Sequence, residues 1–186
     1  MSRRFPLLTE ATMTPRQRES YQAIVSGPRK GATGPFNALL RSPEVADRVQ
    51  KVGEYVRFQS VIPGPLNEMA ILIAGRFWGA QFEFWAHRRL ARTAGLPDAI
   101  IDAIAEGRRP VGMIDDQRIV YDFASELFRD KAVSDTAFQA VTGRFGEQGV
   151  IDLIAAVGYY SIVSMVLNVD RYPLPDGEAP PLEPLP

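Results

Sequence analysis

The sequence predicts an all-α protein of about eight helices, and three observations support this prediction. Apolar residues recur at spacings of three and four along most of the chain, as in the valines of "VADRVQKVGEYV", which is the period of a helix buried on one face. Residues that favour helix starts or ends flank several of these segments. No segment shows the alternation of apolar and polar residues that is typical of a half-buried strand.

The expected helices follow one another with short connections. Thr14 precedes Pro15 and Gly27 ends the first helix, while Ser42 precedes a second Ser-Pro-Glu start. Between them, the glycine-rich "KGATGPFNALL" leads into a short apolar segment. The remaining helices are expected within 66–77, 80–94, 96–107, 115–132, 134–146 and 148–169.

The long apolar stretch that begins at Leu66 needs a break. It is too long for one ordinary helix, and Gly75 and Gly79 mark the expected break, with Gly95 as the C-terminal cap. Residues 172–186 contain six prolines, so this tail is expected to run extended along a surface or to stay mobile. We find no linker that divides the chain, and therefore expect a single domain over residues 1–186.

Composition excludes several classes of chemistry. The 186 residues include no cysteine and one histidine, which excludes disulfides, thiolate metal sites and redox dithiols and argues against a histidine-rich metal site. The formal net charge is −1, whereas proteins that bind nucleic acids usually show a basic excess. We therefore expect no metal, no other cofactor and no nucleic-acid partner.

The apolar segment 150–169 is nearly long enough to span a bilayer. It carries Asp152, Ser161, Ser164 and Asn168 and does not have basic flanks on both sides, so burial in a core or in a subunit interface explains it as well. The N-terminus has no apolar run typical of a signal peptide. The expectation is a cytoplasmic, soluble homo-oligomer without a membrane partner.

The stretch "GRFWGAQFEFWAHRRLAR" holds the only histidine of the chain, His87, four residues after Glu83. Residues four apart lie on one face of a helix, and a carboxylate beside an imidazole raises the pKa of the ring and orients it. Nearby aromatic residues, including Trp78 and Trp85, would amplify this coupling by lowering the local dielectric. Such a pair suits general acid–base catalysis, although the same spacing is also common in pairs on helix surfaces.

The ordered set Glu68, Glu83 and His87, followed by "ARTAGL", resembles the carboxymuconolactone decarboxylase family of the alkylhydroperoxidase D-like superfamily. The likeness extends to "RSPEVADRVQKVGEYVRF", "AIIDAIAEGRRP" and "GVIDLIAAVGYYSIVSMVLNV", and so covers nearly the whole chain. The resemblance implies an all-helical fold and oligomers, commonly trimers or hexamers, with pockets near subunit interfaces.

The resemblance also implies an activity, the cofactor-free removal of CO2 from a small carboxylated lactone such as 4-carboxymuconolactone in aromatic catabolism. Under this hypothesis His87 is the proton donor, Glu83 orients and charges it, and Glu68 is a supporting carboxylate or proton relay. An arginine suits the binding of the substrate carboxylate, and Arg76 near the helix break is the first candidate. Trp78, Trp85 and Tyr159 are further candidates for the substrate pocket.

Two alternatives accompany the decarboxylase reading. One is a non-catalytic oligomer of the same fold that binds a small acid without turnover. The other is an oxidative-stress protein like the superfamily's peroxidases. These peroxidases carry cysteines where this chain has Ala80 and Glu83, and thiol peroxidase chemistry needs a thiolate. The missing cysteines therefore make this alternative improbable.

Overall fold

Residues 2–184 are described by the computed structural model, and within this range the chain forms eight α-helices and no strand. The prediction of an all-α fold of about eight helices is confirmed. The helices are α1 (Pro15–Ser26), α2 (Phe36–Leu39), α3 (Pro43–Phe58), α4 (Gly64–Phe77), α5 (Gln81–Ala94), α6 (Asp98–Ala105), α7 (Asp115–Asp130) and α8 (Asp135–Asp170).

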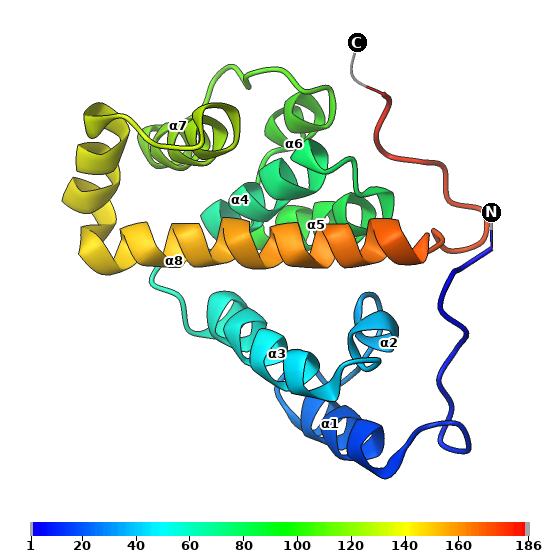
Figure 1. The fold of residues 1–186 in the computed structure, drawn as a ribbon. Helices are drawn as coiled ribbons and strands as arrows, with labels where there is room; N and C mark the ends of the chain where they lie inside the picture. Colours follow the sequence, from blue (N-terminus) through cyan, green and yellow to red (C-terminus); the bar gives the residue numbers. More distant parts are fainter. Residues whose placement is uncertain (1, 185–186) are drawn as a thin grey trace.

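Helix α8 is the axis around which the other helices are arranged (Figure 1). Helices α4 to α7 lie on one side of it, and α1, α2 and α3 lie on the other. Its buried residues contribute to a core with α4 and α7, which includes Leu72, Phe123 and Leu153, and to a second cluster with α3, which includes Val56 and Tyr160. The two groups of helices therefore meet along the inner face of α8.

The expected helix ends are formed by the residues that the sequence indicates. The Thr14 side chain accepts a hydrogen bond from the Gln17 amide, and the Gln17 side chain accepts one from the Thr14 amide, which completes a capping box. Ser134 caps α8 through the amide of Ala137. Gly95 adopts φ 94° after α5, the left-handed conformation that glycine permits at a helix end.

Helix α8 contains one break, at Gly146. This residue has φ 73° and ψ 177°, which is not a helical conformation and is open only to glycine without strain. The segments before and after it correspond to the two helices that the sequence predicts within 134–146 and 148–169. Helix α8 as a whole is long and apolar enough to cross a membrane by length and composition alone, and 56% of its most apolar window is buried inside the protein.

A buried carboxylate fixes the loop between α3 and α4. Asp152, on the inner face of α8, accepts hydrogen bonds from the Val61 amide (2.8 Å), the Ser60 hydroxyl (2.9 Å) and the Tyr55 hydroxyl (3.0 Å). Such bonds compensate for the cost of burying a carboxylate. The loop is therefore anchored to α8, and the end of α3 is held in place relative to the start of α4.

The described part of the proline-rich tail runs extended along the surface, which is one of the two behaviours that the sequence predicts. Leu182 is 2% exposed, and its amide and carbonyl pair with the Gln81 side chain at 3.1 and 2.8 Å. The Arg76 Nη1 group donates to the Glu183 carbonyl at 2.7 Å. These contacts attach the tail to the turn between α4 and α5.

Candidate active site

Helices α4 and α5 form a hairpin that brings Glu68 to His87. The turn between them contains Gly79 in the left-handed region, with φ 58°. On either side of the turn the two helices pack closely: a Cβ atom on Gly75 of α4 would lie 3.6 Å from the backbone nitrogen of Phe84 in α5. Glu68 lies two turns before Gly75 on α4, and seven residues return to nearly the same face of a helix. It therefore faces α5, which carries Glu83 and His87.

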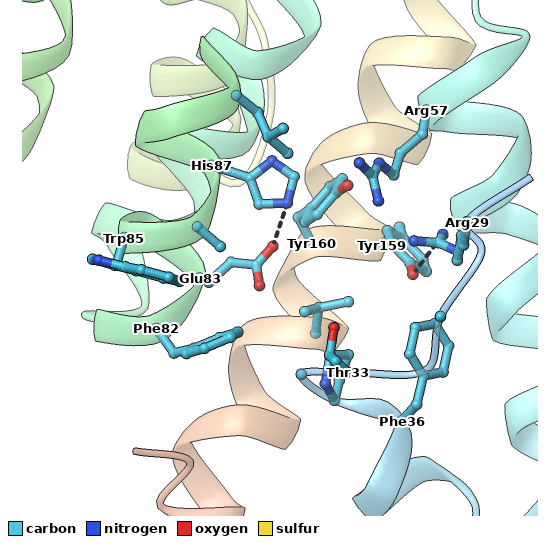
Figure 2. Close-up of a pocket in the computed structure, with 16 residues that line it drawn as sticks. Arg29, Thr33, Phe36, Arg57, Phe82, Glu83, Trp85, His87, Tyr159 and Tyr160 are labelled. Carbon is cyan, nitrogen blue, oxygen red and sulfur yellow. Dashed lines mark hydrogen bonds and ion pairs between the residues drawn. The ribbon is translucent and has the colours of Figure 1, made fainter. Parts of the chain in front are cut away.

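His87 lies between two carboxylates. Its Nδ1 atom is 2.7 Å from Glu68 Oε2, within hydrogen-bond distance, and its Nε2 atom is 3.1 Å from Glu83 Oε1. The contact with Glu83 is drawn as a dashed line in Figure 2. It is an ion pair whose angle does not make a hydrogen bond, so Glu83 Oε1 is buried without a hydrogen-bond partner among the described residues. His87 and Glu83 are 6% and 3% exposed.

This environment sets the charge of the imidazole. Burial of the ring lowers its pKa, but the charges of Glu83 and Glu68 and the direct contacts of both side chains with the ring nitrogens outweigh this effect. Together they raise the pKa of His87 from 6.5 to about 9. The ring is therefore an imidazolium at neutral pH, with a proton on each nitrogen, and can act as a proton donor.

A cavity of about 270 Å³ adjoins His87 and Glu83, and α1–α2 loop residues, α3, α5 and α8 contribute to its wall. Its charged lining residues are Arg29, Arg57, Glu83 and His87. With His87 protonated, three cationic groups thus face one carboxylate. This excess of positive charge in a partly enclosed space attracts an anion.

Sequence reasoning missed both arginines of the cavity. Arg29 comes from the glycine-rich loop after α1 and donates to the Tyr159 hydroxyl at 3.2 Å, whereas Arg57 lies in the last turn of α3 (Figure 2). Neither forms an ion pair with a carboxylate of residues 2–184. Guanidinium groups without a counter-ion at a cavity wall suit the binding of a carboxylate ligand.

Two tyrosines of α8 add hydroxyl groups to the lining of the cavity. Tyr160 packs edge-on against His87, with ring centroids 4.8 Å apart, and its hydroxyl is buried without a hydrogen-bond partner in the described part of the chain. Burial raises the pKa of Tyr160 well above its usual value of 10, so the hydroxyl keeps its proton. Tyr159 is held by Arg29. The lining therefore offers a second donor, from Tyr160, beside the imidazolium.

The predicted pocket residues separate into two groups. Trp85 and Tyr159 line the cavity with His87, but Arg76 and Trp78 do not; they border a different groove, with the tail residues Leu182 to Pro184. Arg76, the first candidate for binding the substrate carboxylate, therefore lies away from the cavity beside His87. Gly75 faces α5, and the next residue of a helix points about 100° further round, so the Arg76 side chain is directed to the tail.

Gly53 is a signal in the sequence that indicates one wall of the site. Glycine is unfavourable inside a helix, and here it permits close approach, since a Cβ atom at this position would overlap the Tyr159 ring and the Arg29 guanidinium. We expect Gly53→Ala to lower the free energy of unfolding by up to about 2 kcal/mol, because an overpacking cost of about 1–3 kcal/mol opposes a gain of about 1 kcal/mol in helix propensity. Denaturant titration measures this change.

Gly143→Ala is the matched control for this prediction. Gly143 lies in α8, and no atom lies within 4 Å of the position that its Cβ atom would occupy, so alanine there should raise the free energy of unfolding by about 0.5–1 kcal/mol. Equal stabilisation by both substitutions would show that Tyr159 and Arg29 do not need the space above Gly53.

The fold and the site define an all-helical protein in which buried Glu83 and His87 border an arginine-lined cavity and the half-buried Glu68 pairs with His87. No model of a known protein family matches the chain. A search of curated proteins finds no match either. Among residues 2–184, no group of three or more histidine, cysteine, aspartate or glutamate side chains is arranged to hold a metal ion.

Proposed function

We propose that the protein is a cofactor-independent carboxy-lyase, or a related lyase or isomerase, that acts on a small carboxylated lactone such as 4-carboxymuconolactone. One observation carries this proposal: a histidine charged by two carboxylates borders a cavity with two arginines that have no carboxylate partner among the described residues. The family resemblance of Glu68, Glu83 and His87 supports the same reaction class. The cavity of about 270 Å³ is small for a ligand site and favours a compact substrate.

The reaction needs no external electron acceptor. The bond between the ring carbon and the leaving carboxylate breaks, CO2 departs, and the electron pair passes through the conjugated C=C bond to the lactone carbonyl oxygen. Protonation of carbon then restores the carbonyl group, so that one proton is consumed for each CO2 released. The protein must therefore hold the substrate, stabilise the enolate oxygen and deliver a proton.

The residues of the cavity supply these three requirements. Arg29 and Arg57 bind carboxylate groups of the substrate. The Tyr160 hydroxyl, which is buried without a partner in the described chain, donates to the enolate oxygen, and one such donor is typically worth about 3 kcal/mol. His87 transfers the proton from Nε2, the nitrogen whose contact with Glu83 is not a hydrogen bond. Glu83 and Glu68 then restore the charge of the ring by relaying a proton from water.

The direct test is a screen of muconolactone-type acids with CO2 release as the readout. The proposal expects at least one acid to be turned over by the protein alone, without added metal or coenzyme. If such acids bind but no CO2 is released and no isomer forms, the protein is a binding protein of the same fold. One observation favours this second function: both ring nitrogens of His87 already have carboxylate neighbours, at 2.7 and 3.1 Å.

Replacing Arg57 with glutamine should weaken substrate binding more than it slows the chemical step. A hydrogen bond to a charged group contributes about 1.5–3 kcal/mol, so KM should rise roughly ten- to hundredfold while kcat changes less. Steady-state kinetics measure the two constants separately. Arg118→Gln is the matched control, because Arg118 is an exposed α7 residue that pairs with Asp115. Equal KM values for wild type and Arg57→Gln would remove Arg57 from the binding site.

The assembly and the location of the protein remain predictions. The family resemblance favours a homo-oligomer, a trimer or hexamer, and the composition favours a cytoplasmic protein. Sedimentation velocity tests the first of these, and fractionation of cells that express the tagged chain tests the second.

A further inference from the structure

The outer face of α8 carries an apolar stripe that no described part of the chain covers. Its members are between 39% and 63% exposed: Ile151, Ile154, Ile162, Met165 and Val169. Their spacings of three, eight, three and four residues place them on one face of the helix, with Gly158 in the middle of the gap of eight. Figure 1 shows α8 with other helices on two sides and none in front of it. Aligned, exposed aliphatic side chains of this kind mark an interaction surface.

The stripe is symmetric about Gly158. Ile154 and Ile162 lie four residues before and after it, and Ile151 and Met165 lie seven residues before and after it. If a second copy of α8 runs antiparallel and is centred on the same glycine, Ile154 lies opposite Ile162 and Ile151 lies opposite Met165. This self-complementary register is the property that a two-fold interface requires.

The centre of the stripe permits close approach of two helices. No atom lies within 4 Å of the position that a Cβ atom on Gly158 would occupy, so the space in front of it is open. Ala155 and Ser161, three residues to either side, are also small. The distance between packed helices depends on the side chains at their contact, and small residues at this crossing allow a short one.

Charges at the ends of the stripe fit a second copy. The stripe itself has no charged member, but Glu147 lies eleven residues before Gly158 on the same face, and Val169 lies eleven residues after it. The antiparallel register places Glu147 opposite Val169 of the second copy, whose carbonyl accepts a hydrogen bond from Arg4 at 3.2 Å. Within residues 2–184, neither Glu147 nor Arg4 forms an ion pair. The two charges therefore complement each other at both ends of the interface, as in the polar rim of known interfaces.

We propose that two copies of the chain associate through a two-fold, antiparallel contact between their α8 helices, centred on Gly158. The opposite face of α8 carries Tyr159 and Tyr160, which line the His87 cavity. One helix thus serves both the site and the interface. This proposal does not depend on the proposed reaction, because its evidence comes from the other face of the helix.

Gly158→Arg tests the interface without disturbing the folded subunit. The side chain has room in the single subunit, and arginine is a better helix former than glycine. In the dimer it would place two like charges at the centre of an apolar contact, so the dissociation constant should rise roughly a hundredfold. Gly143→Arg is the matched control, since Gly143 also lies on α8 with open space before it, and it should leave the sedimentation profile unchanged.

Disulfide trapping tests the register, because the natural chain has no cysteine. Gly158→Cys should form a covalent dimer under mild oxidation. Ile154→Cys alone should not, since the two copies of residue 154 would be separated by about 12 Å along the helix axis, beyond the reach of a disulfide. A mixture of Ile154→Cys and Ile162→Cys subunits should cross-link.

Three results would overturn the proposal. The first is a wild-type protein that sediments as a monomer at concentrations of tens of micromolar. The second is efficient cross-linking of Ile154→Cys with itself, which would indicate a parallel contact or a different centre. The third is co-sedimentation of the wild-type chain, but not of Gly158→Arg, with phosphatidylcholine vesicles, which would show that the stripe binds lipid instead of a second copy.

Discussion

The His87→Gln variant should release CO2 from the lactone substrate roughly 10²- to 10⁴-fold more slowly than the wild type, which is the usual contribution of a positioned acid or base. Glutamine approximates the size of the ring and keeps hydrogen-bonding groups near Glu68, but it cannot carry a transferable proton. The effect should appear in kcat, because Arg29 and Arg57, which we propose bind the substrate, are unchanged. The measurement is single-turnover CO2 release, with circular dichroism as a check that the variant is folded. Turnover equal to that of the wild type would exclude His87 as the proton donor.

The pH profile separates a catalytic His87 from a merely structural one. In the proposed mechanism the acid form of the ring is the active form, and its pKa is raised to about 9, so kcat/KM should fall as the pH rises through about 9. Glu83→Gln removes the charge that does most to raise this pKa, and the descending limb should then move to lower pH. A structural pair would change the amount of folded protein but would not shift the limb. An unchanged limb in Glu83→Gln would assign that pKa to another group.

The helices were predictable because their signals are local. Caps such as Thr14 and Ser134 use side chains a few residues from the amides that they bind, and the conformation of Gly146 interrupts α8 between the two segments predicted there. The Glu83–His87 pair is local as well, because residues four apart lie on one face of a helix. Glu68 is expected beside this pair only from the family resemblance, and the turn between α4 and α5 brings it to His87. The sequence therefore predicts the fold class and the Glu83–His87 pair.

The arginine-lined side of the cavity could not be predicted in the same way. Arg29 and Arg57 line the same cavity as His87 only because α2 and α3 pack against α8, far along the chain, α1 packs against α3, and the loop before α4 is anchored by Asp152. Arg76 is the natural choice from the sequence because it is near the motif. The rotation of about 100° per residue along α4 and the carbonyl of Glu183 in the tail direct it elsewhere. Long-range packing decides which of many arginines borders the site.

The contribution of His87 to the free energy of unfolding should decrease as the pH rises from 6.5 to 9. The folded-state pKa, about 9, lies above the ordinary value of 6.5, so in this window the folded state binds a proton that the unfolded state has released. The favourable contribution is complete below pH 6.5 and is lost as the pH rises through about 9. At about 1.4 kcal/mol for each pH unit, the free energy of unfolding should fall by about 3 kcal/mol across the window.

Urea titrations of the wild type and His87→Gln at several pH values measure this contribution as a difference. The variant has no group at residue 87 that titrates, so the wild-type curve should approach the variant's curve, or cross it, as the pH rises from 6.5 to 9. A constant difference would mean that His87 has the same pKa in both states, which is incompatible with a ring buried between Glu68 and Glu83. If the stability of the wild type relative to that of the variant instead increases with pH, the ring is neutral in the folded protein. Burial would then outweigh the two carboxylates. In that case His87 could accept a proton at neutral pH but could not deliver one to the substrate carbon.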